Sequence, residues 1–334
     1  MNPMKSMVAV TGADGFIGSH LVELLVERGH QVRAMVQYNS FGTWGWLDTL
    51  SPDVMAAVEV LPGDVRDPES VYDLVCKADV VYHLAALIAI PYSYRAPQSY
   101  VETNVLGTLN VLEAVRSLCT PRMVHTSTSE TYGTAREVPI GESHPLQAQS
   151  PYAATKIGAD KLVESYHASF GLPVVTLRPF NTFGPRQSAR AFIPTVISQI
   201  AADADVVKVG ALEPTRDFTF VKDTAEAFFT LGTAAEQAVV GGLFNSGTGQ
   251  EISMGRLART IADLMGADTE FRSDAARERP ASSEVMRLVC DSGRLRRDTG
   301  WRPRYTLEEG LKDTIEWFLD PLNLARYRPS LYNI

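Results

Sequence analysis

The sequence predicts an α/β fold in which a doubly wound parallel sheet is joined by a smaller, discontinuous C-terminal lobe. Two observations predict it. Short apolar, β-branched runs alternate with longer stretches of helical periodicity, and a glycine-rich turn follows the first of these runs. Near-continuous apolar strands that alternate with helices are typical of a parallel sheet covered on both faces. At 334 residues the chain is long enough for such a sheet and a second lobe.

Strands and helices are expected in alternation up to residue 178. Apolar runs predict strands at residues 7–10, 31–36, 58–61, 80–84, 123–127 and 174–178. Helical spacing of apolar residues predicts helices at residues 18–28, 100–118 and 151–170.

Beyond residue 178, prolines and glycines break the alternation. We expect a helix at residues 194–202, strands at 218–221 and 243–245, and two helical stretches after residue 252. The expected division places residues 1–182, with about 217–246, in a dinucleotide-binding domain. Residues 183–216 and 247–334 would form the smaller lobe.

Charge and composition exclude several classes of protein. Lys and Arg number 31 against 39 Asp and Glu, and the net charge of −8 argues against non-specific binding of DNA or RNA. The three cysteines form no CxxC pair and the six histidines lack zinc-ligand spacing, so we expect a cytoplasmic protein without a disulfide framework or a metal site. The most apolar stretch, residues 80–90, is too short for a membrane span, and we expect no signal peptide.

The segment from Gly12 to Gly18, with the sequence GADGFIG, predicts a phosphate-binding loop between the first strand and the first helix. In such a loop Gly12 permits a tight turn, Gly15 lets the backbone approach a pyrophosphate, and Gly18 lets the helix pack on the sheet. Phe16 and Ile17 belong to the same loop, which opens the first helix, and the N-terminus of that helix supplies free N–H groups for phosphate oxygens. This context favours a Rossmann-type dinucleotide site over a plain turn.

The residue that distinguishes NAD from NADP is missing from its usual place. Rossmann folds carry an acidic residue about 20 residues after the glycine loop, where it binds the adenine ribose. Here the second strand ends in MVQYNS, with neither a carboxylate nor an arginine suited to a 2′-phosphate. Asn39 and Ser40 could bond either ribose, so NADP stays open beside NAD. Asp64, followed by Val65, is a candidate adenine contact, with a plain strand-end turn as the alternative.

Tyr152 and Lys156 lie four residues apart at the start of an expected helix, so they share one face, one turn apart. A tyrosine with a pKa near 10 is a poor base at neutral pH. A neighbouring ammonium and a positively charged nicotinamide ring would lower that pKa and make Tyr152 a base for a sugar or alcohol hydroxyl. A chance pair on an amphipathic helix is the alternative, and the glycine loop upstream argues against it.

The segment HTSTSETYG, residues 125–133, follows a strand and is expected at the carboxyl end of the sheet, where ligands bind. Thr128 is a candidate hydrogen-bond partner of Tyr152. Glu130 is more informative, because oxidising a hydroxyl needs no second carboxylate, whereas removing a proton from a carbon beside a ketone does. A solvent-facing loop glutamate is the alternative.

Together these motifs resemble the extended short-chain dehydrogenase/reductase family of NAD-dependent nucleotide-sugar epimerases and dehydratases, over nearly the whole chain. The motifs that carry the resemblance are GADGFIG (12–18), GDV (63–65), HLAA (83–86), TSE (128–130), YAATK (152–156), RPFNTFGPR (178–186) and RDFTFV (216–221). Segments 38–48, 184–195 and 279–291 are most similar to 4,6-dehydratases that act on UDP-N-acetylglucosamine in legionaminic-acid-type pathways. The resemblance implies a cofactor site that also includes Leu84, Ala85, Ala86 and Pro179.

The resemblance implies a lyase reaction. Tyr152, assisted by Thr128 and Lys156, would deprotonate the C4 hydroxyl of a nucleotide sugar while the C4 hydride passes to NAD⁺. Glu130 would take the acidified C5 proton as water leaves C6, and the hydride would return to C6 to give a 4-keto-6-deoxy sugar. The related dTDP-glucose enzymes carry an aspartate where this chain has Ser129. Either Glu130 or a water held by Ser129 would then protonate the leaving hydroxyl.

Other activities stay open beside this one. A nucleotide-sugar 4-epimerase of the same family usually lacks the glutamate, and a UDP-glucuronate decarboxylase shares the Thr-Ser-Glu triplet. A non-catalytic dinucleotide sensor would be free to lose Tyr152, Lys156 and Glu130, all of which are present.

The expected substrate is a nucleotide sugar, UDP-linked by resemblance, held in the smaller lobe. Asn181 resembles the family asparagine that contacts the diphosphate region. Arg186, Arg216 and Arg279 are candidates for clamping phosphates, because arginine binds two oxygens at once, with surface ion pairs as the alternative. In relatives the helices equivalent to residues 101–118 and 152–170 pair across a two-fold axis as a four-helix bundle, so the resemblance also implies a homodimer.

Overall fold

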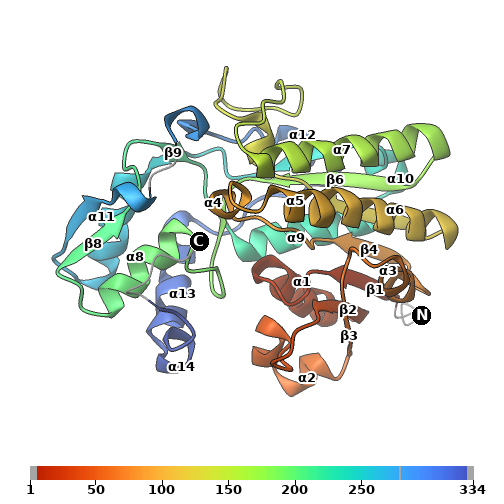
Figure 1. The fold of residues 1–334 in the computed structure, drawn as a ribbon, viewed down its shortest axis with the longest axis horizontal. Coiled ribbons are helices and arrows are strands. Elements are labelled where there is room, and N and C mark those ends of the chain that lie inside the picture. The colour runs from red at the N-terminus through yellow and green to blue at the C-terminus, as the bar shows by residue number, and fades with distance from the viewer. Residues whose placement is uncertain (1–5, 278–279, 329–334) are drawn as a thin grey trace.

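A seven-stranded parallel sheet, together with the helices that cover it, forms the larger part of the molecule (Figure 1). The structure, a computed structural model, describes residues 6–277 and 280–328. The strands lie in the order β11-β6-β5-β4-β1-β2-β3, so the order reverses between β1 and β4, as in a Rossmann-type sheet. Their bounds are β1 (Met7–Thr11), β2 (Gln31–Gln37), β3 (Val58–Gly63), β4 (Val80–His83), β5 (Arg122–Thr126), β6 (Val174–Pro179) and β11 (Leu243–Ser246). The expected doubly wound α/β fold is confirmed.

Helices cover both faces of the sheet, because successive strand residues point to opposite faces. Val8 and Val10 of β1 lie in one hydrophobic core and Ala9 lies in the other. The first core is closed by α1 (Phe16–Glu27) and α9 (Val221–Thr233). The second is closed by α3 (Pro68–Val75), α6 (Gly107–Ser117) and α7 (Pro151–Phe170).

A smaller lobe lies at one end of the sheet (Figure 1). Its core buries apolar residues of several helices, among them Val196, Ile261 and Ile315. The larger elements of the lobe are α8 (Phe192–Ala201), β8 (Val206–Val209), α11 (Met254–Met265), β13 (Glu270–Ser273), α13 (Leu307–Leu319) and α14 (Pro321–Leu324). Short strands pair as β10-β7 and β12-β9-β14, with bounds β7 (Thr182–Phe183), β9 (Thr215–Arg216), β10 (Thr219–Phe220), β12 (Ile252–Ser253) and β14 (Arg287–Leu288).

The remaining elements are single turns or short helices in the connections. The short helices are α2 (Pro52–Met55), α4 (Ile90–Ser93), α5 (Pro97–Tyr100), α10 (Glu236–Val239) and α12 (Gly293–Thr299). The 3₁₀ turns are η1 (Gly45–Thr49), η3 (Ser129–Tyr132), η4 (Ala275–Arg277) and η5 (Ala281–Ser283).

The helix expected at residues 100–118 is interrupted by a wider turn. A π-helical segment, η2 (Val101–Leu106), separates α5 from α6. Within it, buried Asn104 accepts the N–H of Leu87 at 2.8 Å and donates to the Leu87 carbonyl oxygen at 3.0 Å. The distortion therefore coincides with a contact to the loop after β4. The spacing of apolar residues along the helix does not predict such a contact.

The strand expected at residues 218–221 is shorter than predicted at both ends. Only Thr219 and Phe220 pair as β10, and α9, which was not predicted, begins at Val221. No side chain caps the N-terminus of α9, so the usual start signal is absent.

Part of the C-terminal region packs on the sheet rather than in the smaller lobe. Leu295 and Trp301 are buried in the core beneath α1 and α9. The Trp301 Nε1–H donates to the carbonyl oxygen of Asp223 on α9 at 3.1 Å. The segment around α12 therefore contacts the dinucleotide-binding part, whereas the expected division assigned all of 247–334 to the lobe.

Residues 6–277 and 280–328 contain no helix both long enough and apolar enough to span a membrane. They also contain no cluster of three or more His, Cys, Asp or Glu side chains arranged to hold a metal ion.

A pair of helical glycines tests the packing of α9 on the sheet. A Cβ at Gly232 of α9 would lie 2.0 Å from the Tyr82 hydroxyl, whereas a Cβ at Gly158 of α7 would meet only Val105 Cγ2 at 3.5 Å. Gly232→Ala should lower the free energy of unfolding by about 1–3 kcal/mol through overpacking. Gly158→Ala should leave it unchanged or raise it by up to about 1 kcal/mol. Urea unfolding measures both, and equal effects would contradict this packing.

Candidate active site

A pocket of about 850 Å³ opens at the carboxyl ends of the central strands, between the sheet and the smaller lobe. Its walls include Gly12 and Thr128 from the sheet side, and Ile193 of α8 and Val209 of β8 from the lobe. Open α/β sheets bind ligands outside the carboxyl ends of the strands, where the strand order reverses. The volume falls in the range of sites that enclose a whole ligand.

The glycine loop after β1 lies too close to the backbone around it for side chains to fit. Gly12 has φ +67°, and a Cβ there would lie 2.8 Å from the backbone N of Ala85. A Cβ at Gly18 would lie 2.1 Å from the Gly12 carbonyl oxygen. No side chain caps α1, which begins at Phe16 in the pocket wall. The bare loop and the uncapped helix end therefore fit the pyrophosphate of a dinucleotide.

Most of the predicted cofactor residues line this pocket: Gly12, Gly15, Phe16, Ile17, Gly18, Asp64, Val65, Leu84, Ala85, Ala86, Tyr152, Lys156 and Pro179. Asn39 and Ser40 do not belong to its wall. The Asn39 side chain is held within its own loop, where Oδ1 accepts the N–H of Phe41 at 3.1 Å. The Asn39 side chain therefore stabilises this turn and is not directed at a ligand.

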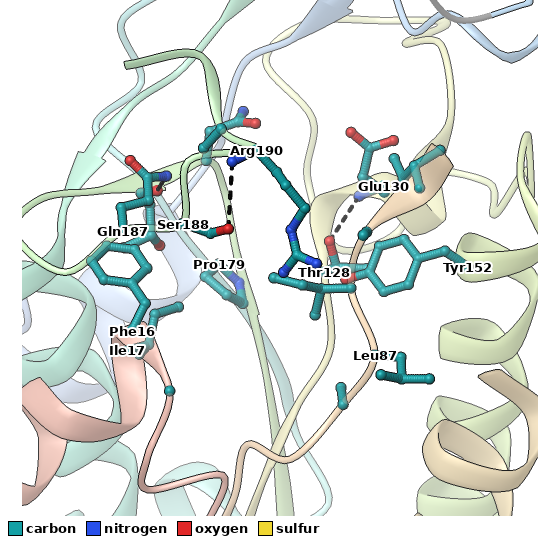
Figure 2. A pocket seen from close by; sticks show the side chains of 18 of the residues that line it. Phe16, Ile17, Leu87, Thr128, Glu130, Tyr152, Pro179, Gln187, Ser188 and Arg190 are labelled. Carbon is teal, nitrogen blue, oxygen red and sulfur yellow. Dashed lines mark hydrogen bonds between the residues drawn. The ribbon is translucent and has the colours of Figure 1, made fainter. Parts of the chain in front are cut away.

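Tyr152 enters the pocket from the first turn of α7. The helix starts here because Ser150 Oγ accepts the N–H of Ala153 at 3.1 Å and Pro151 follows at a position that needs no N–H donor. Tyr152 is buried, with Thr128 beside its ring (Figure 2). Burial raises the pKa of Tyr152, and a hydrogen bond with Thr128 lowers it by less. In the protein alone, the neutral phenol is therefore favoured.

Lys156 is buried one turn further along α7 and also lines the pocket. Its Nζ donates to the carbonyl oxygen of Thr126, at the end of β5, at 2.5 Å. Burial lowers the pKa of Lys156 to about 8, and the charge of Asp160 acts in the opposite direction. Tyr152 and Lys156 thus share one helix face, as their spacing predicts. The ammonium alone does not bring the pKa of Tyr152 below its ordinary value.

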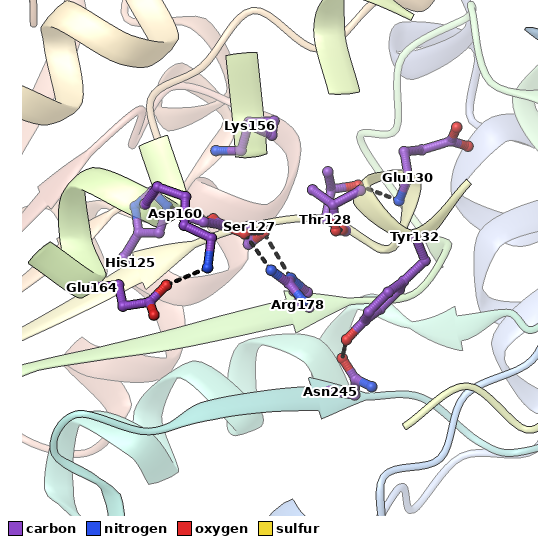
Figure 3. A network of polar contacts seen from close by, with 12 residues as sticks. His125, Ser127, Thr128, Glu130, Tyr132, Lys156, Asp160, Glu164, Arg178 and Asn245 are labelled. Carbon is purple, nitrogen blue, oxygen red and sulfur yellow. Dashed lines mark hydrogen bonds and ion pairs between the residues drawn. The ribbon is translucent and has the colours of Figure 1, made fainter. Parts of the chain in front are cut away.

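Behind Lys156, a buried polar network ties α7 to β5 and β6 (Figure 3). Asp160 Oδ2 accepts hydrogen bonds from Arg178 Nη2 at 2.6 Å and from Ser127 Oγ at 2.7 Å. Its Oδ1 lies 3.2 Å from His125 Nε2. Burial raises the pKa of Asp160, but the hydrogen bond from His125 and the charge of Arg178 outweigh it and hold the pKa at about 2. Asp160 is therefore ionised, and His125 donates, because a carboxylate only accepts.

Glu130 lies on η3, directly after β5, and lines the pocket. Its backbone N–H donates to Thr128 Oγ1 at 3.3 Å, and buried Ser129 also lines the pocket. The Glu130 carboxylate points away from the Tyr152 hydroxyl (Figure 2). Its negative charge is still near enough to raise the pKa of Tyr152. The structure thus brings Glu130 and Tyr152 to one pocket, with the Glu130 carboxylate directed away from the Tyr152 hydroxyl (Figure 2).

Two of the predicted substrate residues line the pocket, Asn181 and Arg216. Asn181 Nδ2 donates to the carbonyl oxygen of Asp217 at 3.3 Å. Arg216 Nη2 forms an ion pair with Glu284 Oε1 at 3.1 Å, and Glu284 lines the pocket as well. Both side chains are therefore held by neighbours at the site expected for a substrate.

The other two predicted substrate residues do not join them. Arg186 is absent from the pocket wall, because its Nη1 lies 2.7 Å from Glu23 Oε2 on α1 and donates to Ser19 Oγ at 3.2 Å. Arg186 therefore forms the ion pair that was the alternative to phosphate binding. Arg279 lies outside the described residues.

The pocket wall contains further polar residues that were not predicted from the sequence. Arg190, in the loop before α8, extends its guanidinium toward Thr128 (Figure 2). Gln187 and Ser188 of the same loop also line the pocket, as do Asp14 and Gln37 near the glycine loop. Arg190 follows the RPFNTFGPR motif closely in the chain, and this closeness could have predicted it as a pocket residue. A loop side chain that reaches a neighbouring strand leaves no such signal in the sequence.

The parallel sheet, the glycine loop and the Tyr152–Lys156 pair define a Rossmann-type dinucleotide-binding protein equipped for acid–base chemistry. A family model described as GDP-mannose 4,6-dehydratase matches residues 9–314, and the chain belongs to that family. The family expected from the motifs is therefore confirmed.

Relatives with two activities match over nearly the whole chain. A dTDP-glucose 4,6-dehydratase of Xanthomonas campestris pv. campestris is 32% identical over 331 residues, which cover 93% of this chain and 92% of that protein. A UDP-glucose 4-epimerase of Mycolicibacterium smegmatis is 33% identical over 317 residues, which cover 92% and 97%. The solved structure of a double mutant of DesIV, a dTDP-glucose 4,6-dehydratase from Streptomyces venezuelae with NAD bound, has a TM-score of 0.85 at 27% identity and covers 94% and 97%.

Replacing Lys156 by methionine should change how stability depends on pH. Burial lowers the pKa of Lys156 from 10.5 to about 8, so the unfolded chain binds more protons between these values and wild-type stability rises with pH across that window. Relative to Lys156→Met, the wild-type free energy of unfolding should rise by up to about 3 kcal/mol. Urea unfolding of both proteins below and above the window measures this. A difference independent of pH would contradict a buried ammonium.

Proposed function

We propose that this protein is an NAD-dependent nucleotide-sugar 4,6-dehydratase, a lyase that converts UDP-N-acetylglucosamine into its 4-keto-6-deoxy derivative. One observation carries the proposal: Glu130 lines the same pocket as Tyr152 and Lys156. Oxidation and re-reduction at C4 need the tyrosine and the lysine, whereas elimination of water also needs a base for the C5 proton. A carboxylate beside this pair therefore favours the lyase reaction.

The proposed cofactor is NAD, held by the glycine loop, the N-terminus of α1 and the residues after β4. The narrow space between Gly12 and Ala85 supports this, because such bare backbone is what a pyrophosphate approaches. NAD is also the dinucleotide in the DesIV structure. When bound, NAD⁺ would supply the oxidant that accepts the C4 hydride, and the reduced cofactor would supply that hydride to C6, so that no cofactor is consumed.

In this proposal Tyr152 takes the proton of the C4 hydroxyl. Burial disfavours its phenolate, so nearby positive charge and hydrogen bonding must favour it. Lys156, with a pKa of about 8, still carries its proton at neutral pH. Thr128 holds the tyrosine by a hydrogen bond that lowers the pKa of Tyr152. These two residues therefore act on the base rather than on the sugar carbon.

Glu130 takes the C5 proton as water leaves C6. To do so its carboxylate must turn from its present direction toward the sugar (Figure 2). Catalytic contacts are often incomplete until the substrate binds. The proton for the departing hydroxyl comes either from Glu130 or from a water held by Ser129.

The charge of the pocket suits the diphosphate of a nucleotide sugar. Arg190 and Arg216 bring guanidinium groups to it, and Asn181 adds an amide donor. The choice of UDP-N-acetylglucosamine is supported by segments 38–48 and 184–195, which are most similar to dehydratases acting on that compound.

A nucleotide-sugar 4-epimerase is the second candidate. The direction of Glu130, away from Tyr152, and the 33% identity to a UDP-glucose 4-epimerase favour it. An epimerase would use Tyr152 and Thr128 and would leave the mass of the sugar unchanged. A UDP-glucuronate decarboxylase, the third reaction expected within the family, would release carbon dioxide instead of water.

Glu130→Gln should separate the two halves of the proposed reaction. Water loss should slow about 100-fold or more, because the variant lacks the base for the C5 proton. Oxidation at C4 should persist, so reduced nicotinamide should accumulate while the sugar keeps its mass. Near-ultraviolet absorbance and mass spectrometry of the sugar nucleotide follow the two steps.

Two variants control this experiment. Glu137→Gln alters an exposed glutamate further along the same connection and should behave as the wild type. Tyr152→Phe should block both steps while NAD still binds. Wild-type rates of water loss by Glu130→Gln would show that another group removes the C5 proton, and a wild-type product of unchanged mass would select the epimerase.

We also propose a cytoplasmic homodimer built on the helices of residues 101–118 (η2 and α6) and 152–170 (α7). Val101 and Leu106 of η2 and Phe170 of α7 are exposed apolar residues, which a four-helix bundle with a second copy would bury. The three cysteines are unpaired, as suits a reducing compartment. Sedimentation at micromolar concentration should report twice the chain mass. A monomer alone would contradict the dimer.

A further inference from the structure

An acidic side chain lies at the end of β2, although the sequence has none at that point of the strand. Asp14, the residue before Gly15 in the glycine loop, turns its carboxylate onto β2. Its Oδ2 accepts the backbone N–H of Gln37, the last residue of β2, at 3.2 Å. Asp14 and Gln37 both line the pocket. A loop residue thus brings a carboxylate to the strand end where other Rossmann folds carry their ribose-binding acid.

That position decides which dinucleotide a Rossmann fold accepts. The acid hydrogen-bonds the ribose 2′-hydroxyl of NAD, whereas an arginine nearby accommodates the 2′-phosphate of NADP. Residues 37–50 include neither Lys nor Arg. Arg66 lines the pocket, but its guanidinium is paired with Asp64 at 2.6 Å. A 2′-phosphate at the end of β2 would therefore meet a carboxylate.

The loop after β2 holds Asp14 from the other side. The Trp46 N–H donates to the Asp14 carbonyl oxygen at 3.0 Å, and a Cβ at Gly45 would lie 2.9 Å from the Asp14 Cβ. The Trp46 ring in turn packs edge-on against Trp317 of α13, with 5.5 Å between ring centroids. The backbone of Asp14 is therefore fixed between β2 and a loop anchored on the smaller lobe, so its carboxylate is positioned before any ligand binds.

We propose that Asp14 selects NAD over NADP, because its carboxylate accepts hydrogen bonds from the adenine ribose and repels a 2′-phosphate. Burial raises the pKa of Asp14 and so disfavours its ionised form. A hydrogen bond donated by a ribose hydroxyl would act in the opposite direction and stabilise the carboxylate. The inference rests on the dinucleotide dependence proposed above, but it holds for a dehydratase and an epimerase alike.

Asp14→Asn tests the charge while keeping an oxygen that can accept the Gln37 N–H. Isothermal titration with NAD⁺ and NADP⁺, on protein freed of bound nucleotide, measures both dissociation constants. The variant should bind NAD⁺ about tenfold or more weakly, because a charged acceptor is lost, and the preference for NAD⁺ over NADP⁺ should fall by at least the same factor. The matched control is Asp48→Asn. Asp48 also accepts a backbone N–H, from Trp44 at 3.0 Å, but does not line the pocket. The preference of Asp48→Asn for NAD⁺ over NADP⁺ should therefore equal that of the wild type.

A second variant keeps the test decisive if Asp14→Asn alone weakens the loop. Asp14→Asn combined with Gln37→Asp returns a carboxylate to the strand end and should restore the preference for NAD⁺. An unchanged ratio in Asp14→Asn, or no recovery in the double variant, would overturn the role of Asp14. Wild-type protein that binds neither dinucleotide would instead overturn the proposed function as a whole.

Discussion

The buried ion pair between Asp160 and Arg178 sets the position of the active-site helix. Their charged atoms lie 2.6 Å apart and join α7 to β6, while Ser127 and His125 add hydrogen bonds from β5 and its end. One turn earlier on α7, Lys156 reaches the carbonyl oxygen at the end of β5. Removing one partner of such a pair leaves a buried charge uncompensated, which is strongly destabilising. The register of α7 against the sheet, and with it the place of Tyr152, depends on this contact.

Burial then sets the chemistry of the pocket. It raises the pKa of Tyr152 and lowers the pKa of Lys156, so it opposes the charged form of both residues. Negative charge from Glu130 opposes the phenolate further. In the proposed reaction Tyr152 would therefore act as a base only when a ligand brings positive charge to the pocket, which would link proton removal to the presence of a bound oxidant. The pocket wall also includes Arg190 and Arg216, and Arg216 is paired there with Glu284.

The parts of this site that the sequence predicts are those in which local spacing determines geometry. Gly12 and Gly18 permit close backbone contacts within one loop, and Tyr152 and Lys156 share a helix face because they lie four residues apart. The parts it does not predict depend on partners distant in the chain. Arg186, for example, pairs with Glu23 on another helix. The start of α9 was missed for a different reason, because no capping side chain marks it. Asp14 reaches β2 from a loop, so a search for an acid at the usual distance along the chain cannot find it.

In the proposed reaction, a carboxylate beside the Tyr152–Lys156 pair turns reversible oxidation at C4 into elimination. To test this, the purified protein is incubated with UDP-N-acetylglucosamine in heavy water, and the mass and deuterium content of the product are determined. A dehydratase should give a product that has lost one water and carries one solvent deuterium at C5, because the C5 proton is removed and replaced from solvent. A sugar nucleotide of unchanged mass without deuterium at C5 would contradict it.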